Sequence, residues 1–229
     1  MRRLFALLAV LAFAAIFLGL VKGYSERQTR FPLAEYYLTQ VPRELGAPNV
    51  VTGILITYRG FDTLGEVAVL FMVAASVGVL LGDKPDDKKR AIPAQESEPS
   101  ELVRTGAEVI LPLIFLFGAY VIMNGHLSAG GGFQGGAVVA SGIMLLLLAN
   151  PASQLHHGFL SVTESLAGVL YVSIGILGMV FFGGFLDSHI LPRGTFGTLL
   201  SAGAIPLISA LLGIKVGAEL SVVIDRFRN

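Results

Sequence analysis

Charged side chains inside long apolar runs are the residues of this sequence best suited to chemistry. Charged residues lie within or at the ends of these runs, and histidines lie near their expected outer ends: Asp62, Glu66, Glu108, Lys215, Glu219, His126 and His189. A charge at the centre of a bilayer costs at least about 2.5–3.5 kcal/mol, so each one needs a partner or a function. Carboxylates and histidines in such a setting can load and release a cation or a proton.

An acidic pair with a nearby arginine stands at the start of the second apolar run. Arg59 and Asp62 are three residues apart and Asp62 and Glu66 are four apart, so all three can share one helical face. One interpretation is a site that loads a proton or sodium ion at a membrane entrance, with Arg59 tuning the acids. The other is local: Asp62 caps the helix, and Glu66 favours its positive N-terminal end.

A glycine-rich segment, NGHLSAGGGFQGG, covers residues 124–136. It contains Gly130, Gly131, Gly132, Gly135 and Gly136. Such a run is too flexible to be helical throughout, so it predicts a broken segment whose backbone groups face an aqueous cavity. Small residues that recur every four positions equally predict close helix packing, and the two interpretations are compatible. No Lys-Ser/Thr pair follows, so a phosphate loop is excluded. His126 is either a proton shuttle or an ordinary hydrogen-bonding histidine.

Lys215 and Glu219 are four residues apart in the last apolar run and can form an ion pair there. A functional alternative is that Lys215 modulates the charge of a neighbouring carboxylate as an ion passes. Glu108 has Arg104 as its nearest partner in sequence. The adjacent His156 and His157 have no third ligand nearby, so no metal site is predicted.

Six apolar runs long enough to span a bilayer must position these side chains. They cover residues 4–21, 64–81, 102–123, 131–149, 165–186 and 196–222. The runs are continuous and rich in Leu and Ala rather than alternating, so the sequence predicts an all-α integral membrane protein and not a β-barrel. The first run exceeds the apolar core of a signal peptide, and we expect it to be retained as a helix.

The charged and proline-rich stretch at 83–101 is the best domain boundary. It predicts a two-helix module at 1–82 and a four-helix module at 102–229, joined by a cytoplasmic linker. Lysines and arginines concentrate at the two ends and at positions 84–90. Positive charge favours the inner side of a membrane, so both termini are expected in the cytoplasm of a prokaryotic cell.

Composition excludes several classes of function. Hydrophobic residues make up 54% of the 229 and charged residues only 14%, well below the share in soluble domains. The net charge is zero, so there is no basic surplus for nucleic acid. Cysteine is absent, which excludes disulfides, thiolate metal sites and cysteine nucleophiles. No nucleophile–base pair or nucleotide loop is found, so we expect no active site in this chain.

Two stretches of the C-terminal half resemble the MnhB/MrpB family of multisubunit Na⁺/H⁺ antiporter components. They are GHLSAGGGFQGGAVVASG and LLSAGAIPLISALLGIKVGAEL, with Ala129 where the family has proline. In the N-terminal half, NVVTGILITYRGFDTLGEVAVLF is similar to MbhE, a small component of membrane-bound hydrogenases, and to the end of the large MrpA protein of Mrp antiporters.

The resemblance implies a role in a cation-translocating complex. Proteins of this kind are thought to carry the sodium path, while larger antiporter-like subunits handle protons. It favours functional roles for Asp62, Glu66, His126 and Lys215, with less support for Glu108 and Glu219. Partners would be other membrane subunits of an Mrp-type module, with hydrogenase or ferredoxin-binding subunits at the periphery, and any redox cofactors would lie on those chains. The fusion of the two modules favours a hydrogenase-type complex over a free-standing Mrp antiporter.

Replacing Glu66 by glutamine tests the first of these positions. If the carboxylate lies in the sodium path, Glu66→Gln abolishes sodium transport while the complex still assembles, since only the ionisable proton site is removed. Transport by membrane vesicles and a native gel measure the two outcomes. Normal transport removes Glu66 from the path, and lost subunits on the gel indicate a scaffold whose charges make contacts between subunits.

Overall fold

The computed structural model describes residues 2–25, 29–81 and 99–228. Within these ranges the chain is all helical and has no strand, as the sequence predicts. The α-helices are α1 (Arg2–Gly23), α2 (Pro32–Glu44), α3 (Val50–Gly53), α4 (Gly60–Leu80), α5 (Glu101–Met123), α6 (Gly132–Ala149), α7 (His157–Phe181) and α8 (Ile205–Arg228). A π-helical turn, η1 (Ile54–Tyr58), precedes α4, and a 3₁₀ turn, η3 (Ser188–Ile190), follows α7.

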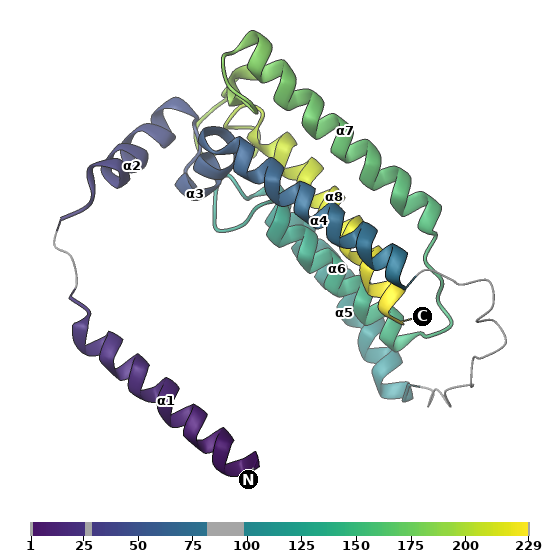
Figure 1. Ribbon diagram of the computed structural model, residues 1–229. Coiled ribbons are helices and arrows are strands. Elements are labelled where there is room, and N and C mark those ends of the chain that lie inside the picture. The colour runs from purple at the N-terminus through teal and green to yellow at the C-terminus, as the bar shows by residue number, and fades with distance from the viewer. Residues whose placement is uncertain (1, 26–28, 82–98, 229) are drawn as a thin grey trace. The chain divides into compact units, whose positions relative to one another are not determined.

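Six of the described helices, α1 and α4–α8, are long and apolar enough to cross a membrane (Figure 1). The predicted number of spans is therefore confirmed. The first four begin and end within four residues of the positions expected from the sequence. Long apolar runs form helices in a membrane because the backbone groups inside lipid must hydrogen-bond to one another.

The last two spans are displaced from their predicted positions. The fifth was expected at 165–186 but runs from His157 to Phe181, and the sixth was expected at 196–222 but runs from Ile205 to Arg228. The residues in between are apolar but form turns. Positive φ angles interrupt any helix there, at Gly183, Leu186, Gly194, Gly197, Ala202 and Gly203. Apolar composition alone does not distinguish such a loop from a span.

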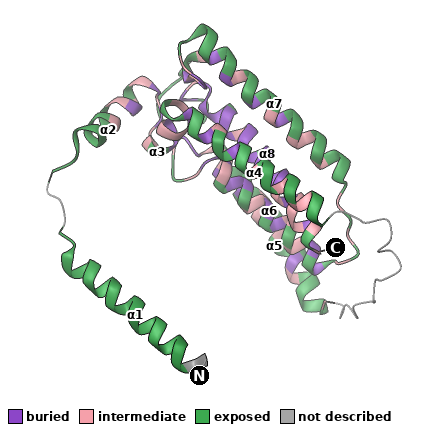
Figure 2. Cartoon of the chain, in the orientation of Figure 1, coloured by how far each residue is buried: buried purple, intermediate pink, exposed green. Residues whose placement is uncertain are grey.

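Helix α8 forms the centre of the helical bundle. It packs against α4, α5, α6 and α7, and more than half of its most apolar window is buried (Figures 1 and 2). Its buried residues include Lys215, Glu219 and Asp225 as well as aliphatic side chains. Helices α4–α7 lie around it and turn large apolar faces outward, toward lipid or partner chains.

Glycines let α6 approach α8 at backbone distance. A Cβ atom at Gly136 would lie 2.9 Å from the Gly213 carbonyl oxygen and 3.0 Å from the Gly217 nitrogen. At Gly132 it would lie 2.6 Å from the Ser209 carbonyl oxygen. Small residues at four-residue spacing thus line the contact, a common way for membrane helices to pack without a hydrophobic driving force.

The chain divides into two compact units, residues 1–36 and 37–229. In the first unit, α1 is apolar and its described side chains are exposed (Figure 2). In the second, α4 from the N-terminal half packs directly on α8 from the C-terminal half. The predicted linker at 83–101 falls mostly on residues 82–98, which lie outside the described residues, so the module boundary stays a prediction.

Replacing Gly136 by alanine should loosen the contact between α6 and α8. The added methyl meets backbone atoms that cannot rotate away, so we expect a loss of about 1–3 kcal/mol in unfolding free energy. Thermal unfolding of the purified chain in detergent measures the change. Gly65→Ala is the matched control, because a Cβ at Gly65 on α4 meets nothing within 4 Å. There the better helix propensity of alanine should leave stability unchanged or slightly higher, and equal losses in both variants would contradict the packing argument.

Candidate functional site

Lys215 lies between two carboxylates in the interior of the bundle. Its Nζ donates to Glu219 Oε2 at 2.9 Å, one turn further along α8. It also donates to Glu164 Oε1 on α7 at 3.2 Å. We call these three residues the Lys215 cluster. The sequence predicts the first pair from its spacing, whereas the second contact joins residues 51 positions apart.

The Lys215 cluster is shielded from water by its own chain. Lys215 is 6% exposed and Glu219 is fully buried. The aliphatic part of Lys215 lies against Gly168 of α7, with Cε 3.6 Å from where a Cβ would be. Its ammonium nitrogen lies 5.6 Å from the centre of the Phe71 ring on α4, within cation–π range. Three helices therefore enclose one cation.

The charges of the Lys215 cluster do not balance. With both acids ionised, one lysine faces two carboxylates and the cluster carries one net negative charge. An uncompensated charge in a low-dielectric interior is costly, so the cluster favours one further cation, either a proton on a carboxyl group or a metal ion nearby. Glu219 Oε1 is buried and has no hydrogen-bond partner among the described residues, which leaves an oxygen for that cation.

A cavity of about 490 Å³ reaches the Lys215 cluster from between α4 and α7. Glu164 and Lys215 line it together with apolar residues, including Leu64, Val67 and Phe71 of α4. Through this cavity Glu164 and Lys215 stay open to the space between α4 and α7.

Glu66 lies at a second cavity, of about 260 Å³, that also contains part of the glycine-rich segment. Gly130, Gly131 and Gly132 line this cavity with Gln134. Gly131 has φ of +151°, a conformation that only glycine adopts readily, and α6 begins at the next residue. The fold thus brings a carboxylate of the N-terminal half to a loop of the C-terminal half, two features that the sequence singles out separately.

Two polar side chains hold the start of the second span against the glycine-rich segment. Asn49 caps α3 and donates to the carbonyls of Gly125 and Ser128, both at 2.7 Å. Thr52 donates to the Gly130 carbonyl at 3.3 Å. These contacts join segments 76 or more residues apart, so sequence spacing gives no indication of them.

Tyr171 is a buried polar residue on the same helix as Glu164. It is on α7, seven residues after Glu164, which places both on one helical face. Its ring is 1% exposed and its hydroxyl has no hydrogen-bond partner among the described residues. The hydroxyl is close enough to Glu66 for an electrostatic interaction. A buried hydroxyl normally finds a partner, so this position suits an ordered water molecule.

The remaining predicted positions lie apart from the Lys215 cluster. Arg59 and Asp62 form an exposed ion pair at the start of α4. Glu108 is exposed on α5 and lines a different cavity, of about 300 Å³, with Arg104 and Asn150. Neither group belongs to the ion pairs of Lys215, which are with Glu164 and Glu219.

His126 is buried in the turn between α5 and α6. Its Nε2 lies 3.3 Å from the Thr198 carbonyl oxygen, so it is the donor and Nδ1 carries no proton in the neutral ring. Burial lowers the pKa of the imidazole, and the backbone carbonyls of Thr198 and Met123, which favour the protonated ring, only partly offset this effect. The structure thus favours a neutral His126 that joins two loops.

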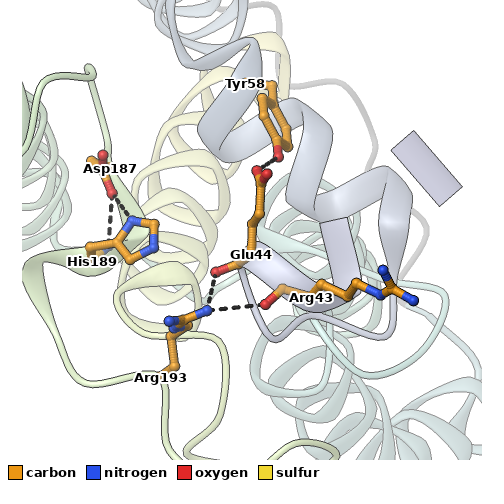
Figure 3. A network of polar contacts seen from close by, with 6 residues as sticks. All are labelled: Arg43, Glu44, Tyr58, Asp187, His189 and Arg193. Atoms are coloured by element: carbon orange, nitrogen blue, oxygen red, sulfur yellow. Dashed lines mark hydrogen bonds and ion pairs between the residues drawn. The ribbon is translucent and has the colours of Figure 1, made fainter. Parts of the chain in front are cut away.

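The same end of the bundle is tied together by a polar network (Figure 3). Arg193 donates to the carbonyls of Arg43 and Glu44 at the end of α2, each at 3.0 Å. The Tyr58 hydroxyl donates to the Glu44 carboxylate. Asp187 accepts from both the backbone and the ring of His189, so His189 is part of a local turn.

Glu164 is the functional candidate that the sequence did not reveal. Its apolar run was expected to begin at Ser165, which left Glu164 in a loop, but α7 begins at His157 and carries Glu164 into the bundle. The signal that could have found it is its seven-residue spacing from both His157 and Tyr171, which places all three on one face of a helix.

These observations define a multi-pass membrane protein with ionisable side chains buried between its helices. The chain belongs to the family described as a domain related to the MnhB subunit of Na⁺/H⁺ antiporter, whose model matches residues 102–222. Residues 1–97 match a second family model, MbhE, which describes a component of MBH. The two resemblances noted in the sequence are therefore confirmed.

Curated relatives agree with this family. The chain is 30% identical over 196 residues to an uncharacterized protein of Methanocaldococcus jannaschii, covering 76% of this chain and 74% of that one. It is 34% identical over 107 residues to the B component of a Na⁺/H⁺ antiporter of Bacillus subtilis, covering 44% of this chain and 70% of the relative. A probable K⁺/H⁺ antiporter component of Rhizobium meliloti, of type A/B, is 29% identical over 84% of this chain, which spans only 22% of that protein.

Two solved structures share the fold. A chain of the membrane-bound sulfane sulfur reductase, an archaeal respiratory membrane complex, is 37% identical, with a TM-score of 0.81. The alignment covers 99% of this chain and 97% of that one. A chain of the Mrp complex from Dietzia sp. DQ12-45-1b is 24% identical, with a TM-score of 0.70 over 96% of this chain and 26% of that one, and shows the likeness of fold alone. The chain is thus a subunit of an Mrp-type antiporter module or of a related membrane-bound respiratory complex.

The lowered pKa of His126 predicts how stability depends on pH. The unfolded chain binds a proton near the ordinary histidine pKa of 6.5, whereas the folded chain binds it only at lower pH. The stability that His126 contributes is therefore fully present above about pH 6.5 and is lost as pH falls through the folded-state pKa. Thermal unfolding in detergent between about pH 8 and pH 5 should show this loss. His126→Gln can still donate to Thr198 but cannot titrate, so its stability should fall less over the same range, and parallel curves would exclude the effect.

Proposed function

We propose that this chain is an ion-translocating subunit in which the Lys215 cluster exchanges a proton and the Glu66 cavity receives a sodium ion. The observation that carries the proposal is the sharing of one buried lysine by two carboxylates on different helices. It is supported by the family to which the chain belongs, whose description names a Na⁺/H⁺ antiporter.

Proton exchange at the Lys215 cluster follows from its excess of one carboxylate. When Glu164 is protonated, the remaining charges form a neutral Lys215–Glu219 pair within α8. When Glu219 is protonated instead, they form a neutral Lys215–Glu164 pair between α8 and α7. The ammonium group can favour either acid because its nitrogen lies 3.2 Å from the first and 2.9 Å from the second. A sodium ion would be repelled by Lys215, so a proton is the better match here.

Sodium binding fits the Glu66 cavity better. Hard cations prefer oxygen ligands, and this cavity combines the Glu66 carboxylate, the Gln134 side chain and the backbone around Gly130–Gly132. The described residues that line it include no basic side chain. Tyr171 interacts with Glu66 from the α7 side and is two turns from Glu164, so a charge change at one site is felt toward the other.

The proposed setting is a multisubunit complex with other Mrp-type membrane subunits. This protein resembles a chain of an archaeal sulfane sulfur reductase complex along nearly its whole length. The resemblance favours a respiratory complex of the reductase or hydrogenase type. Peripheral hydrogenase-like or ferredoxin-binding subunits would then hold the redox cofactors. A free-standing Mrp antiporter is the alternative, and the relatives named as antiporter components favour it. In either setting we propose that both termini face the cytoplasm.

A purely structural role is the competing class. Charges that tie subunits together must be available at a surface, as the exposed Arg59 and Asp62 are. Lys215 and Glu219 are instead buried and paired within the chain. They are therefore poor candidates for contacts between subunits, and their cost in stability calls for another purpose.

Replacing Glu164 by glutamine tests the proton site most directly. The variant keeps the Lys215–Glu219 pair, so the bundle and the complex should form, but the cluster no longer carries an extra negative charge for a proton. We expect sodium-dependent proton movement to fall at least about tenfold. The measurement is dye-detected acidification in proteoliposomes containing the whole complex, with assembly checked on a native gel.

Two further variants make the result interpretable. Glu101→Gln removes an exposed carboxylate at the start of α5 and should leave transport unchanged. Lys215→Met leaves two buried acids without a counter-ion and should lower thermal stability as well as transport. Full transport by Glu164→Gln overturns the proposal, and a loss of assembly in Glu164→Gln alone supports the structural class.

A further inference from the structure

A second buried carboxylate lies at the C-terminal end of α8. Asp225 Oδ2 lies 2.8 Å from Nε2 of His157, the first residue of α7. Asp225 Oδ1 lies 3.0 Å from the Arg228 guanidinium, which also donates to the carbonyls of Pro151 and Ser153 at 2.9 and 3.1 Å. From the sequence, His157 is only excluded as a metal ligand, and no other role is predicted for it.

The two partners differ sharply in exposure. The Asp225 side chain is 2% exposed, whereas the His157 side chain is 50% exposed. Both line a cavity of about 330 Å³ together with Arg228 and the loop at Pro151–Leu155. A half-exposed imidazole in contact with a buried carboxylate connects solvent to the interior, which a surface ion pair does not.

This site lies on the same side of α7 as the Lys215 cluster. His157 and Glu164 are seven residues apart, which is close to two full turns and a rise of about 10 Å. Ser161 lies between them, one turn from each. On α8, Asp225 is six residues beyond Glu219, a rise of about 9 Å. At about 2.8 Å between hydrogen-bonded oxygens, a chain of about three water molecules spans such a gap.

We propose that His157 and Asp225 form the proton port of the Lys215 cluster, at the end of the bundle where α7 begins and α8 ends. This inference rests on the proposed proton exchange at Glu164 and Glu219. The ligand is a proton from bulk water, taken up or released at the imidazole.

The proton balance of the step is simple. In the resting state Nε2–H donates to Asp225, so Nδ1 carries the free lone pair. A proton from water binds Nδ1, and the Nε2 proton passes to Asp225 Oδ2. Asp225 then gives this proton to a chain of water molecules between α7 and α8, which would carry it to the Lys215 cluster. Return of the Nδ1 proton to Nε2 through water restores the starting tautomer.

The charged groups around the port suit this exchange. Arg228 on α8 pairs with Asp225 through Oδ1, which leaves Oδ2 of the carboxylate to the imidazole. Arg226, also on α8, lies against Gly78 of α4. From the loop before α7, carbonyl oxygens face Arg228, and His156 lies next to His157 in the chain. Near neutral pH, histidine is the side chain in this set whose unperturbed pKa allows ready exchange with water.

His157→Ala in the intact complex tests the port. Without the imidazole, protons reach Asp225 only by direct collision of hydronium, so transport should fall about tenfold near pH 8.5 and little near pH 6. Imidazole added on the side of the port should restore the rate in a concentration-dependent way, which a structural role of His157 does not explain. His156→Ala is the matched control, since this exposed neighbour is one residue away, and its rate and pH profile should match the wild type.

The outcomes separate this inference from the proposed function. If Glu164→Gln loses transport while His157→Ala keeps a wild-type pH profile, the port is wrong and the proton site stands. If both variants transport normally, both are wrong. If His157→Ala loses transport equally at every pH and imidazole restores nothing, His157 acts through structure and the port is overturned. Assembly on a native gel and thermal stability, measured for each variant, exclude loss of the protein itself.

Discussion

A buried positive charge governs this bundle. Lys215 cannot stay ionised in a low-dielectric interior without partners, and the fold supplies one from its own helix and one from α7. Meeting this requirement fixes the rotation of α7 and α8 about their axes, because Glu164 must face Lys215. The same rotation places Gly168, Tyr171 and Gly175 of α7 inside the bundle.

Much of the fold follows from hydropathy, and the exceptions have a common cause. The first four spans and the Lys215–Glu219 pair could be predicted because they depend on local composition and four-residue spacing. Hydropathy assigns both ends of the stretch from Gly183 to Ala204 to spans, yet Leu186 and Ala202 adopt positive φ and are fully buried there. Apolar residues form a loop or a helix depending on what packs around them, and the local sequence pattern does not show this packing.

The same distinction applies to the site. Glu66 and the glycine-rich segment stand out by residue type, but their meeting at one cavity depends on Asn49 and Thr52, which bridge the two halves of the chain. Glu164, His157 and Asp225 are ordinary residues in an ordinary sequence context. They gain chemical meaning only when antiparallel packing sets α7 beside α8. Single-sequence reasoning therefore identified Lys215 and Glu219 but not Glu164, and it gave no role to His157 or Asp225.

The ionisable groups follow one another along α7 in a definite order, from His157 through Glu164 to Tyr171. The His157–Asp225 pair lies at one end, the Lys215 cluster comes next, and Tyr171 with Glu66 follows. Each of these three groups contains residues of at least two helices. Small movements of α4, α7 and α8 relative to one another therefore change the contacts within every group. The cavity beside Lys215 is lined by apolar side chains of α4 and α7, and lipid or a partner helix there sets how much water reaches the cluster.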